Sequence, residues 1–117
     1  MPSREGFQQD LFTMQTVNLA DFMTPGVHIL SGRERGTAIR NALRLEALER
    51  TGDAITVVIP KDVIALNSGF VLNLFGESIR RLGRAEFERL YCFDASPGVL
   101  EDIEGAKKRA LDNLPLP

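Results

Sequence analysis

The sequence predicts a mixed α/β domain in which about four to five strands form the sheet and three main helices pack on it. Residues 55–59 (ITVVI) form an unbroken β-branched run, which is typical of a buried strand. Two longer segments, after residues 31 and 67, place apolar side chains at helical spacing. Strand-like and helix-like segments alternate along the chain, and this alternation favours helical crossovers between neighbouring strands.

The composition of the 117-residue chain fits one soluble globular domain. Hydrophobic residues make up 44% and charged residues 26%, close to the averages for such domains. The formal net charge is −2, so no overall positive field attracts nucleic acid, and no apolar run approaches the roughly 18 residues that a membrane span needs. The single cysteine allows no internal disulfide, and the first residues carry no secretory signal, so we expect a cytoplasmic protein.

The first part of the chain predicts a leader and two strands. Residues 1–10 are polar and are expected to form a flexible N-terminal leader, followed by a single domain over residues 11–117. Residues 11–19 carry β-forming side chains and predict a strand. A Thr-Pro-Gly turn at residues 24–26 leads into a short apolar run at residues 27–30, which we expect to pair with that first strand.

A broad apolar face predicts the first helix. After Ser31, apolar side chains recur at helical spacing until Gly52 ends the segment, and Ser31 is the expected N-cap. The following run at residues 55–59 is apolar on both faces, which predicts a strand buried between two layers.

The second half of the chain predicts two more helices with a strand between them. A short apolar stretch at residues 63–66 precedes a helical stripe that runs from Ser68 to Gly83, the expected C-cap. Residues 87–93 (FERLYCF) alternate well enough to predict a strand. The Ser-Pro pair at residues 96–97 then predicts the start of the last helix, with the serine as N-cap.

The residue types give little support for catalysis or for a metal site. A metal centre needs three or four converging ligands, yet the chain has one histidine, His28, and one cysteine, Cys92, without partners at ligand spacing. A Cys–His nucleophilic pair is the alternative. However, Cys92 lies between aromatic residues of a predicted strand, where a thiol is expected to be a buried hydrophobe. We therefore predict that the protein is not an enzyme and needs no metal or cofactor.

The first helix start has the composition of an anion-binding site. Ser31, Gly32, Arg33 and Arg35 combine small residues with two arginines at a place where free backbone N–H groups and the helix dipole favour anions. The segment lacks the lysine and the spacing of a nucleotide-binding P-loop. Two interpretations stay open: a nucleotide or phosphate site, or a capped helix start with solvated arginines, which is the commoner case.

The second helix start, Asn67-Ser68-Gly69-Phe70, is the most informative segment. Ser68 precedes a strongly amphipathic helix, so its hydroxyl is expected at or near the N-cap, where it contributes about 1 kcal/mol. The alternative function is phosphorylation. A helix N-terminus favours a phosphate, whose charge of about −2 changes the surface that a partner protein meets. The residues alone favour the plain cap.

The order of several motifs resembles the STAS-like family of unknown function. Members of this bacterial family carry a Thr-Pro-Gly turn, a Ser-Gly helix start with a downstream arginine, and a serine and a phenylalanine at the start of the next helix, followed by Phe-Gly. The resemblance covers residues 22–93, most of the chain. The matching positions are residues 21–26, Ser31, Gly32, Arg40, residues 66–70, residues 74–76 and Arg80.

The STAS-like family is in turn similar to the STAS domains of anti-sigma-factor antagonists and sulphate transporters. This similarity implies a β core with helices packed on one side, and a helix-start serine that a histidine-kinase-like ATPase phosphorylates. Asn67 and Ser68 fall on the Asp-Ser pair of the antagonists, so an asparagine stands where those proteins have the aspartate.

These observations lead to one primary hypothesis and two alternatives. The primary hypothesis is a non-catalytic regulatory module, similar to an anti-sigma-factor antagonist, that binds a protein partner around Ser68 and is switched there by a histidine-kinase-like ATPase. The first alternative is a nucleotide- or phosphate-binding domain that uses the Ser31-Gly32 helix start. The second is self-association, in which an exposed strand edge pairs with a second copy to form a homodimer.

Overall fold

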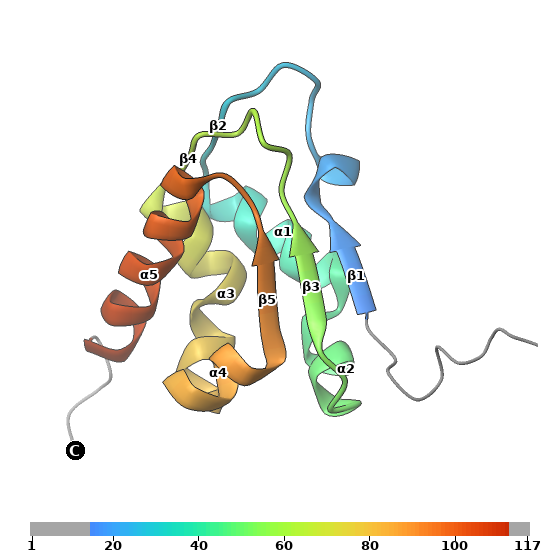
Figure 1. Ribbon diagram of the computed structural model, residues 1–117, viewed down its shortest axis with the longest axis vertical. Coiled ribbons are helices and arrows are strands. Elements are labelled where there is room, and N and C mark those ends of the chain that lie inside the picture. The colour runs from blue at the N-terminus through green and yellow to red at the C-terminus, as the bar shows by residue number, and fades with distance from the viewer. Residues whose placement is uncertain (1–14, 113–117) are drawn as a thin grey trace, which may run out of the picture.

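Two small parallel sheets and five α-helices organise residues 15–112, the part of the chain that the computed structural model describes (Figure 1). The expected leader at residues 1–10 lies outside the described residues. The elements, in chain order, are β1 (Gln15–Asn18), the 3-10 helix η2 (Leu19–Phe22), β2 (Ile29–Leu30), α1 (Arg33–Leu43), α2 (Leu45–Arg50), β3 (Ile55–Val58), β4 (Ala65–Leu66), α3 (Ser68–Leu82), α4 (Arg84–Leu90), β5 (Tyr91–Asp94) and α5 (Pro97–Asp112).

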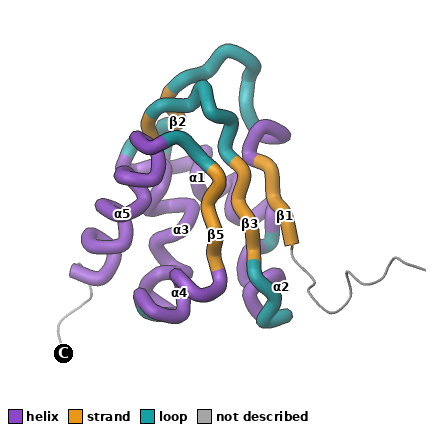
Figure 2. Tube along the Cα trace, in the orientation of Figure 1, coloured by secondary structure: helices purple, strands orange, loops and turns teal. Residues whose placement is uncertain are grey.

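Strand β3 is the centre of the larger sheet, in the order β1-β3-β5 with all strands parallel. The smaller sheet pairs β2 with β4, also in parallel, so that Leu30 lies opposite Leu66. The predicted pairing of residues 27–30 with the first strand is therefore wrong. Leu30 and Leu66 are both buried, which is the physical reason that the two short strands lie together. Long loops carry the chain between the two sheets at one end of the molecule (Figure 2).

Within residues 15–112, helices cover only one face of the larger sheet (Figure 1). Val17, Ile55 and Val57 are buried on the helix side, whereas Thr56 and Val58, which alternate with them, are half-buried. The prediction that residues 55–59 are covered on both faces is therefore wrong. The α/β class with three main helices, α1, α3 and α5, is confirmed, and two short helices, α2 and α4, join them.

The predicted strand at residues 87–93 begins only at Tyr91, because residues 84–90 form α4. Phe87 and Leu90 are three residues apart, so on a helix they share one face, and both are buried. Phe87 stacks on Tyr91 with 4.6 Å between the ring centroids. Gly83 ends α3 as predicted: its φ is +83°, and its N–H donates to the Ile79 carbonyl at 2.9 Å.

The first predicted helix is broken at Arg44, whose φ of +56° is left-handed. Leu45 follows Ile39 by six residues, which on a continuous helix would place the two side chains about 120° apart. The break between α1 and α2 instead allows both side chains to be buried. Burial of Leu45 therefore offsets the unfavourable backbone at Arg44.

Helices α1 and α3 approach each other closely at Gly36. A β-carbon at this position would lie 2.4 Å from the Phe70 carbonyl oxygen, closer than any real contact. Thr37, one residue further along α1, donates a hydrogen bond to Asn73 of α3 at 3.2 Å. The two helices therefore form a fixed pair that begins beside the smaller sheet.

Candidate functional site

The two helix starts that the sequence singles out lie side by side. Strands β2 and β4 run in parallel, and the Asn67 N–H donates to the Leu30 carbonyl across them at 2.8 Å. Helix α1 begins at Arg33 soon after β2, and α3 begins at Ser68 soon after β4. Both predicted sites therefore belong to one surface, which we call the paired helix starts: residues 31–35 and 67–70.

Asn67, rather than Ser68, is the N-cap of α3. Its side-chain oxygen accepts a hydrogen bond from the Gly69 N–H at 3.0 Å. Ser68 is the first residue of the helix and is exposed. Its hydroxyl makes no hydrogen bond to any other residue between 15 and 112, so it is free to react with a visiting group. Structural capping and an accessible hydroxyl are thus divided between two neighbouring residues.

Arg33 connects the two starts. A β-carbon at Gly69 would lie 3.2 Å from Cγ and 3.9 Å from Nε of Arg33, so the arginine crosses the first turn of α3. Gly32, with φ of +103°, is the N-cap of α1, and no side chain of the described residues caps this helix. The prediction that Ser31 is the N-cap is therefore wrong; the left-handed backbone at Gly32 takes its place.

Three further members of the predicted sites differ in accessibility. Ser31 and Arg35 are exposed, as an anion-binding role requires. Phe70 is fully buried, and its carbonyl faces Gly36 of α1. Phe70 therefore anchors α3 in the core, and its side chain does not reach a partner.

A small hollow of about 190 Å³ adjoins Ser68, between the start of α3 and α5. Its lining carries both signs of charge, from Glu101, Asp102 and Arg109. Asp102 also accepts a hydrogen bond from the Leu66 N–H at 2.8 Å, which ties α5 to β4. A negative charge added at Ser68 would therefore meet Arg33 on one side and this mixed lining on the other.

Three large apolar side chains are exposed in the elements next to the paired helix starts. Ile29 is in β2, Ile64 immediately precedes β4, and Leu100 is in the first turn of α5, with exposed fractions of 55%, 59% and 39%. The start of α5 packs closely here, because a β-carbon at Gly98 would lie 2.4 Å from the Ile64 carbonyl oxygen. Apolar surface of this kind is typical of protein contacts.

His28 lies next to the smaller sheet, whereas Cys92 lies in the larger one. His28 precedes β2, and its Nδ1 lies 2.9 Å from the Asp62 carbonyl oxygen. Cys92 is exposed on β5, so its predicted burial is wrong. Its neighbours Tyr91 and Phe93 point toward the helices, so Cys92 points to the uncovered face of the sheet. Residues 15–112 hold no group of three His, Cys, Asp or Glu side chains placed to bind a metal ion.

No protein-family model, curated protein or solved structure matches this chain. In the described part of the chain, no helix combines the length and the apolar character needed to cross a bilayer.

A buried ionic network is the feature that the sequence analysis missed. The Glu49 carboxylate, in α2, accepts hydrogen bonds from the Ser78 and Tyr91 hydroxyls at 2.5 Å each and from the Arg81 guanidinium. Arg40, in α1, donates to the same Ser78 hydroxyl at 2.9 Å. The spacing of the sequence carried a signal for this network. Arg40 lies four residues after the buried Gly36 in α1, and Ser78 lies four residues after the buried Leu74 in α3. Residues four positions apart share one helix face, so both polar side chains belong to a buried face.

The network places a strong constraint on Tyr91. Burial, and then the hydrogen bond to Glu49, raise the pKa of the Tyr91 hydroxyl far above its ordinary value. The phenol therefore stays protonated and acts as a fixed donor to Glu49. This network joins α1, α2, α3 and β5 and so holds the helix pair in place on the sheet.

Proposed function

We propose that the protein is a non-catalytic regulatory module that binds a partner protein through the paired helix starts and is switched by phosphorylation of Ser68. The observation that carries the proposal is the position of Ser68: exposed, at the first residue of the 15-residue helix α3, with Arg33 alongside. The resemblance to anti-sigma-factor antagonists points to the same serine and to a histidine-kinase-like ATPase as the modifying partner.

The local electrostatics support a phosphate at this position. The helix N-terminus presents unpaired N–H groups and a partial positive charge, which stabilise an anion by about 0.3–1 kcal/mol at an exposed site. The Arg33 guanidinium is within reach of the first turn of α3 and supplies charge-assisted hydrogen bonds. A phosphate on Ser68 is therefore accommodated without unfolding α3, while it reverses the charge of the surface.

The capping role of Asn67 explains how an asparagine serves where the antagonists have an aspartate. A cap needs a side-chain oxygen that accepts a backbone N–H, and the Asn67 amide oxygen does so for Gly69 at 3.0 Å. The asparagine adds no negative charge next to Ser68. The helix start is therefore intact, and a phosphate on Ser68 adds negative charge next to a cap residue that carries none.

The exposed apolar side chains provide a surface that a partner protein could bind. Ile29 is in β2, Ile64 precedes β4 and Leu100 is in α5; β2 pairs with β4, α5 packs against β4, and β4 leads into α3. Burial of apolar surface supplies affinity, and the charge at Ser68 decides whether that surface can be desolvated. A partner would thus make a constant apolar contact and meet a charge at Ser68 that changes with phosphorylation.

The test is a binding comparison with histidine-kinase-like ATPases of the same organism. Wild type, Ser68→Ala and Ser68→Asp are measured by titration calorimetry. Ala42→Asp places the same charge at an exposed position of α1 outside the paired helix starts, so it serves as the control and is expected to bind like the wild type. We expect Ser68→Ala to bind like the unmodified wild type, and Ser68→Asp to change the Kd by about tenfold or more. Equal binding by all the variants would remove Ser68 from the mechanism.

A further inference from the structure

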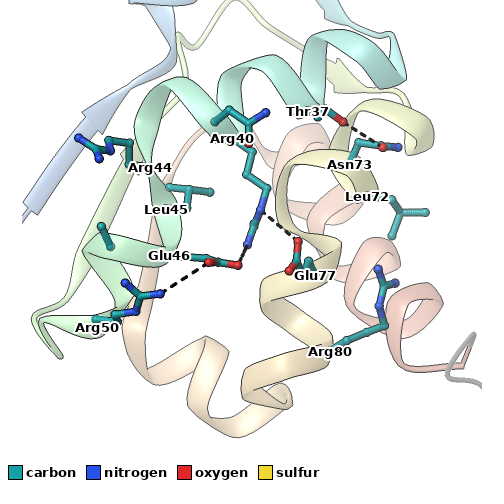
Figure 3. A pocket seen from close by; sticks show the side chains of 12 residues that line it. Thr37, Arg40, Arg44, Leu45, Glu46, Arg50, Leu72, Asn73, Glu77 and Arg80 are labelled. Carbon is teal, nitrogen blue, oxygen red and sulfur yellow. Dashed lines mark hydrogen bonds and ion pairs between the residues drawn. The ribbon is translucent and has the colours of Figure 1, made fainter.

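A groove of about 500 Å³ lies between α1, α2 and α3 (Figure 3). It begins one turn beyond the paired helix starts, at the hydrogen bond between Thr37 and Asn73. Four arginines and two glutamates line it, so the lining carries an excess of two positive charges. In a chain whose formal net charge is −2, this groove is a local concentration of positive charge.

Arg40 is the deepest of these arginines, with a side chain only 9% exposed. Its Nη1 donates to the Leu74 carbonyl and to the Ser78 hydroxyl, both at 2.9 Å. These bonds fix the guanidinium in place and orient its other edge, formed by Nε and Nη2. Two parallel N–H groups on such an edge are the donors with which arginine binds an oxyanion in a bidentate manner.

That edge lacks the hydrogen bonds it needs. Arg40 Nε lies 3.6 Å from Glu77 Oε1, and Nη2 lies 4.0 Å from Glu46 Oε2, both too long for hydrogen bonds. Nη2 is buried and has no acceptor among residues 15–112. An unsatisfied buried donor on a charged group is costly, and it identifies a position where an acceptor from outside the chain would be stabilised.

We propose that this groove binds a small phosphorylated ligand, with one phosphoryl group held by the Nε and Nη2 edge of Arg40. Arg44 and Arg80 make no ion pair with any described residue and line the same groove, so they supply the remaining positive charge. Glu46 and Glu77 are 48% and 59% exposed and occupy the edge only loosely. The ligand displaces these two carboxylates into solvent.

The residues that line the groove also indicate the chemical character of the rest of the ligand. The described residues of the groove include Asn41, Asn73 and Thr37, which hydrogen-bond to hydroxyl groups, but no aromatic side chain on which a nucleobase would stack. A hydrophilic phosphate ester or a pyrophosphate therefore fits better than a nucleotide. The excess of two positive charges favours a phosphate over a single carboxylate.

The experiment measures the binding of pyrophosphate, glucose 6-phosphate and citrate to the full chain by titration calorimetry at constant ionic strength. We expect both phosphate compounds to bind, and citrate to bind at least tenfold more weakly than pyrophosphate. Citrate binding as tight as pyrophosphate would overturn the assignment of a phosphoryl site. No binding of either phosphate compound at millimolar concentration would overturn the site altogether.

Variants separate the groove from general charge effects. Arg44→Ala with Arg80→Ala removes two exposed charges from the groove, and we expect the Kd for pyrophosphate to rise about tenfold or more. Lys108→Ala with Arg109→Ala removes two exposed charges from α5 and is expected to change the Kd less than twofold. Equal effects of the two double variants would show attraction to overall charge only and would overturn the proposal.

Arg40 and Glu77 test the bidentate edge itself. Arg40→Lys keeps the charge but loses the planar edge, so we expect weaker binding by about tenfold; circular dichroism checks that the variant is folded. Glu77→Gln removes a competing carboxylate at the surface and is expected to tighten binding by about threefold. Unchanged binding by folded Arg40→Lys, or weaker binding by Glu77→Gln, would contradict the assignment of this edge.

Discussion

Arg33 of α1 crosses the first turn of α3 at Gly69, where a β-carbon would lie 3.2 Å from the arginine Cγ. This contact joins two segments that are 36 residues apart in the sequence and turns two separate helix starts into one surface. The parallel pairing of β2 with β4 produces it, because each short strand delivers its helix to the same end of the molecule. A charge placed on either start is therefore felt by the other.

The division of roles between Asn67 and Ser68 has a measurable consequence for stability. Asn67→Ala removes the cap of α3 and is expected to lower the free energy of unfolding by about 1 kcal/mol. Ser68→Ala removes a hydroxyl that bonds to no described residue and is expected to change it by less than about 0.5 kcal/mol. Urea unfolding measures both. A larger loss for Ser68→Ala than for Asn67→Ala would show that Ser68 is the structural cap.

The close approach of α1 and α3 predicts opposite effects for two glycine substitutions. Gly36→Ala forces a β-carbon against the Phe70 carbonyl and is expected to destabilise the protein by about 1–3 kcal/mol. Gly105→Ala, in α5, meets nothing within 4 Å and is expected to stabilise it by about 0.5–1 kcal/mol. Thermal unfolding distinguishes the two, and equal effects would contradict the tight helix contact.

The Glu49 carboxylate is expected to contribute more to the free energy of unfolding than the carboxylate of an exposed glutamate. Glu49→Gln weakens charge-assisted hydrogen bonds from Ser78, Tyr91 and Arg81 and should cost about 2 kcal/mol. Glu101→Gln, at an exposed position, serves as the control and should change stability by less than about 0.5 kcal/mol. A near-neutral Glu49→Gln would mean that the network contributes nothing to folding.

The raised pKa of the Tyr91 hydroxyl predicts how the free energy of unfolding changes at alkaline pH. Burial and the bond to Glu49 raise the pKa of its hydroxyl in the folded protein, whereas an unfolded tyrosine ionises near about pH 10. Above that pH the unfolded chain loses a proton that the folded chain keeps. The free energy of unfolding therefore falls as the pH rises beyond 10, and the full contribution is present below it.

The chain has one tyrosine and no tryptophan, so phenolate absorbance reports on Tyr91 alone. We expect the folded protein to show no phenolate signal until it unfolds, and Tyr91→Phe to flatten the fall in stability at alkaline pH. A phenolate signal near pH 10 in the folded protein would contradict the buried network.

The sequence predicted the features that depend on local periodicity. The amphipathic stripe from Ser68 to Gly83 and the glycine that ends it are confirmed, as is the N-cap at Ser96, whose Oγ accepts the Val99 N–H at 3.4 Å. The strand predicted at residues 87–93 was wrong for most of its length. A run of seven residues with mixed polarity fits the helical period of about 3.6 residues as well as the strand period of two.

The features that depend on tertiary contacts could not be predicted from the sequence. The break at Arg44 follows from the burial of Leu45, and the exposure of Cys92 follows from a sheet that is covered on one face. The contact between Arg33 and Gly69 requires knowledge that β2 pairs with β4. Periodicity does not encode strand pairing, so sequence analysis found both helix starts without finding that they meet.

Phosphorylation-site mapping by mass spectrometry determines whether Ser68 is the residue that the partner ATPase modifies. The protein is incubated with ATP and the histidine-kinase-like ATPase that binds it, with Ser68→Ala and Ser31→Ala treated in parallel. We expect a single phosphate on Ser68, lost in Ser68→Ala and kept in Ser31→Ala. We expect none on Ser96, whose hydroxyl donates a hydrogen bond to the Val63 carbonyl at 2.8 Å. A phosphate on another residue, or none on the wild type, would contradict the proposed switch at Ser68.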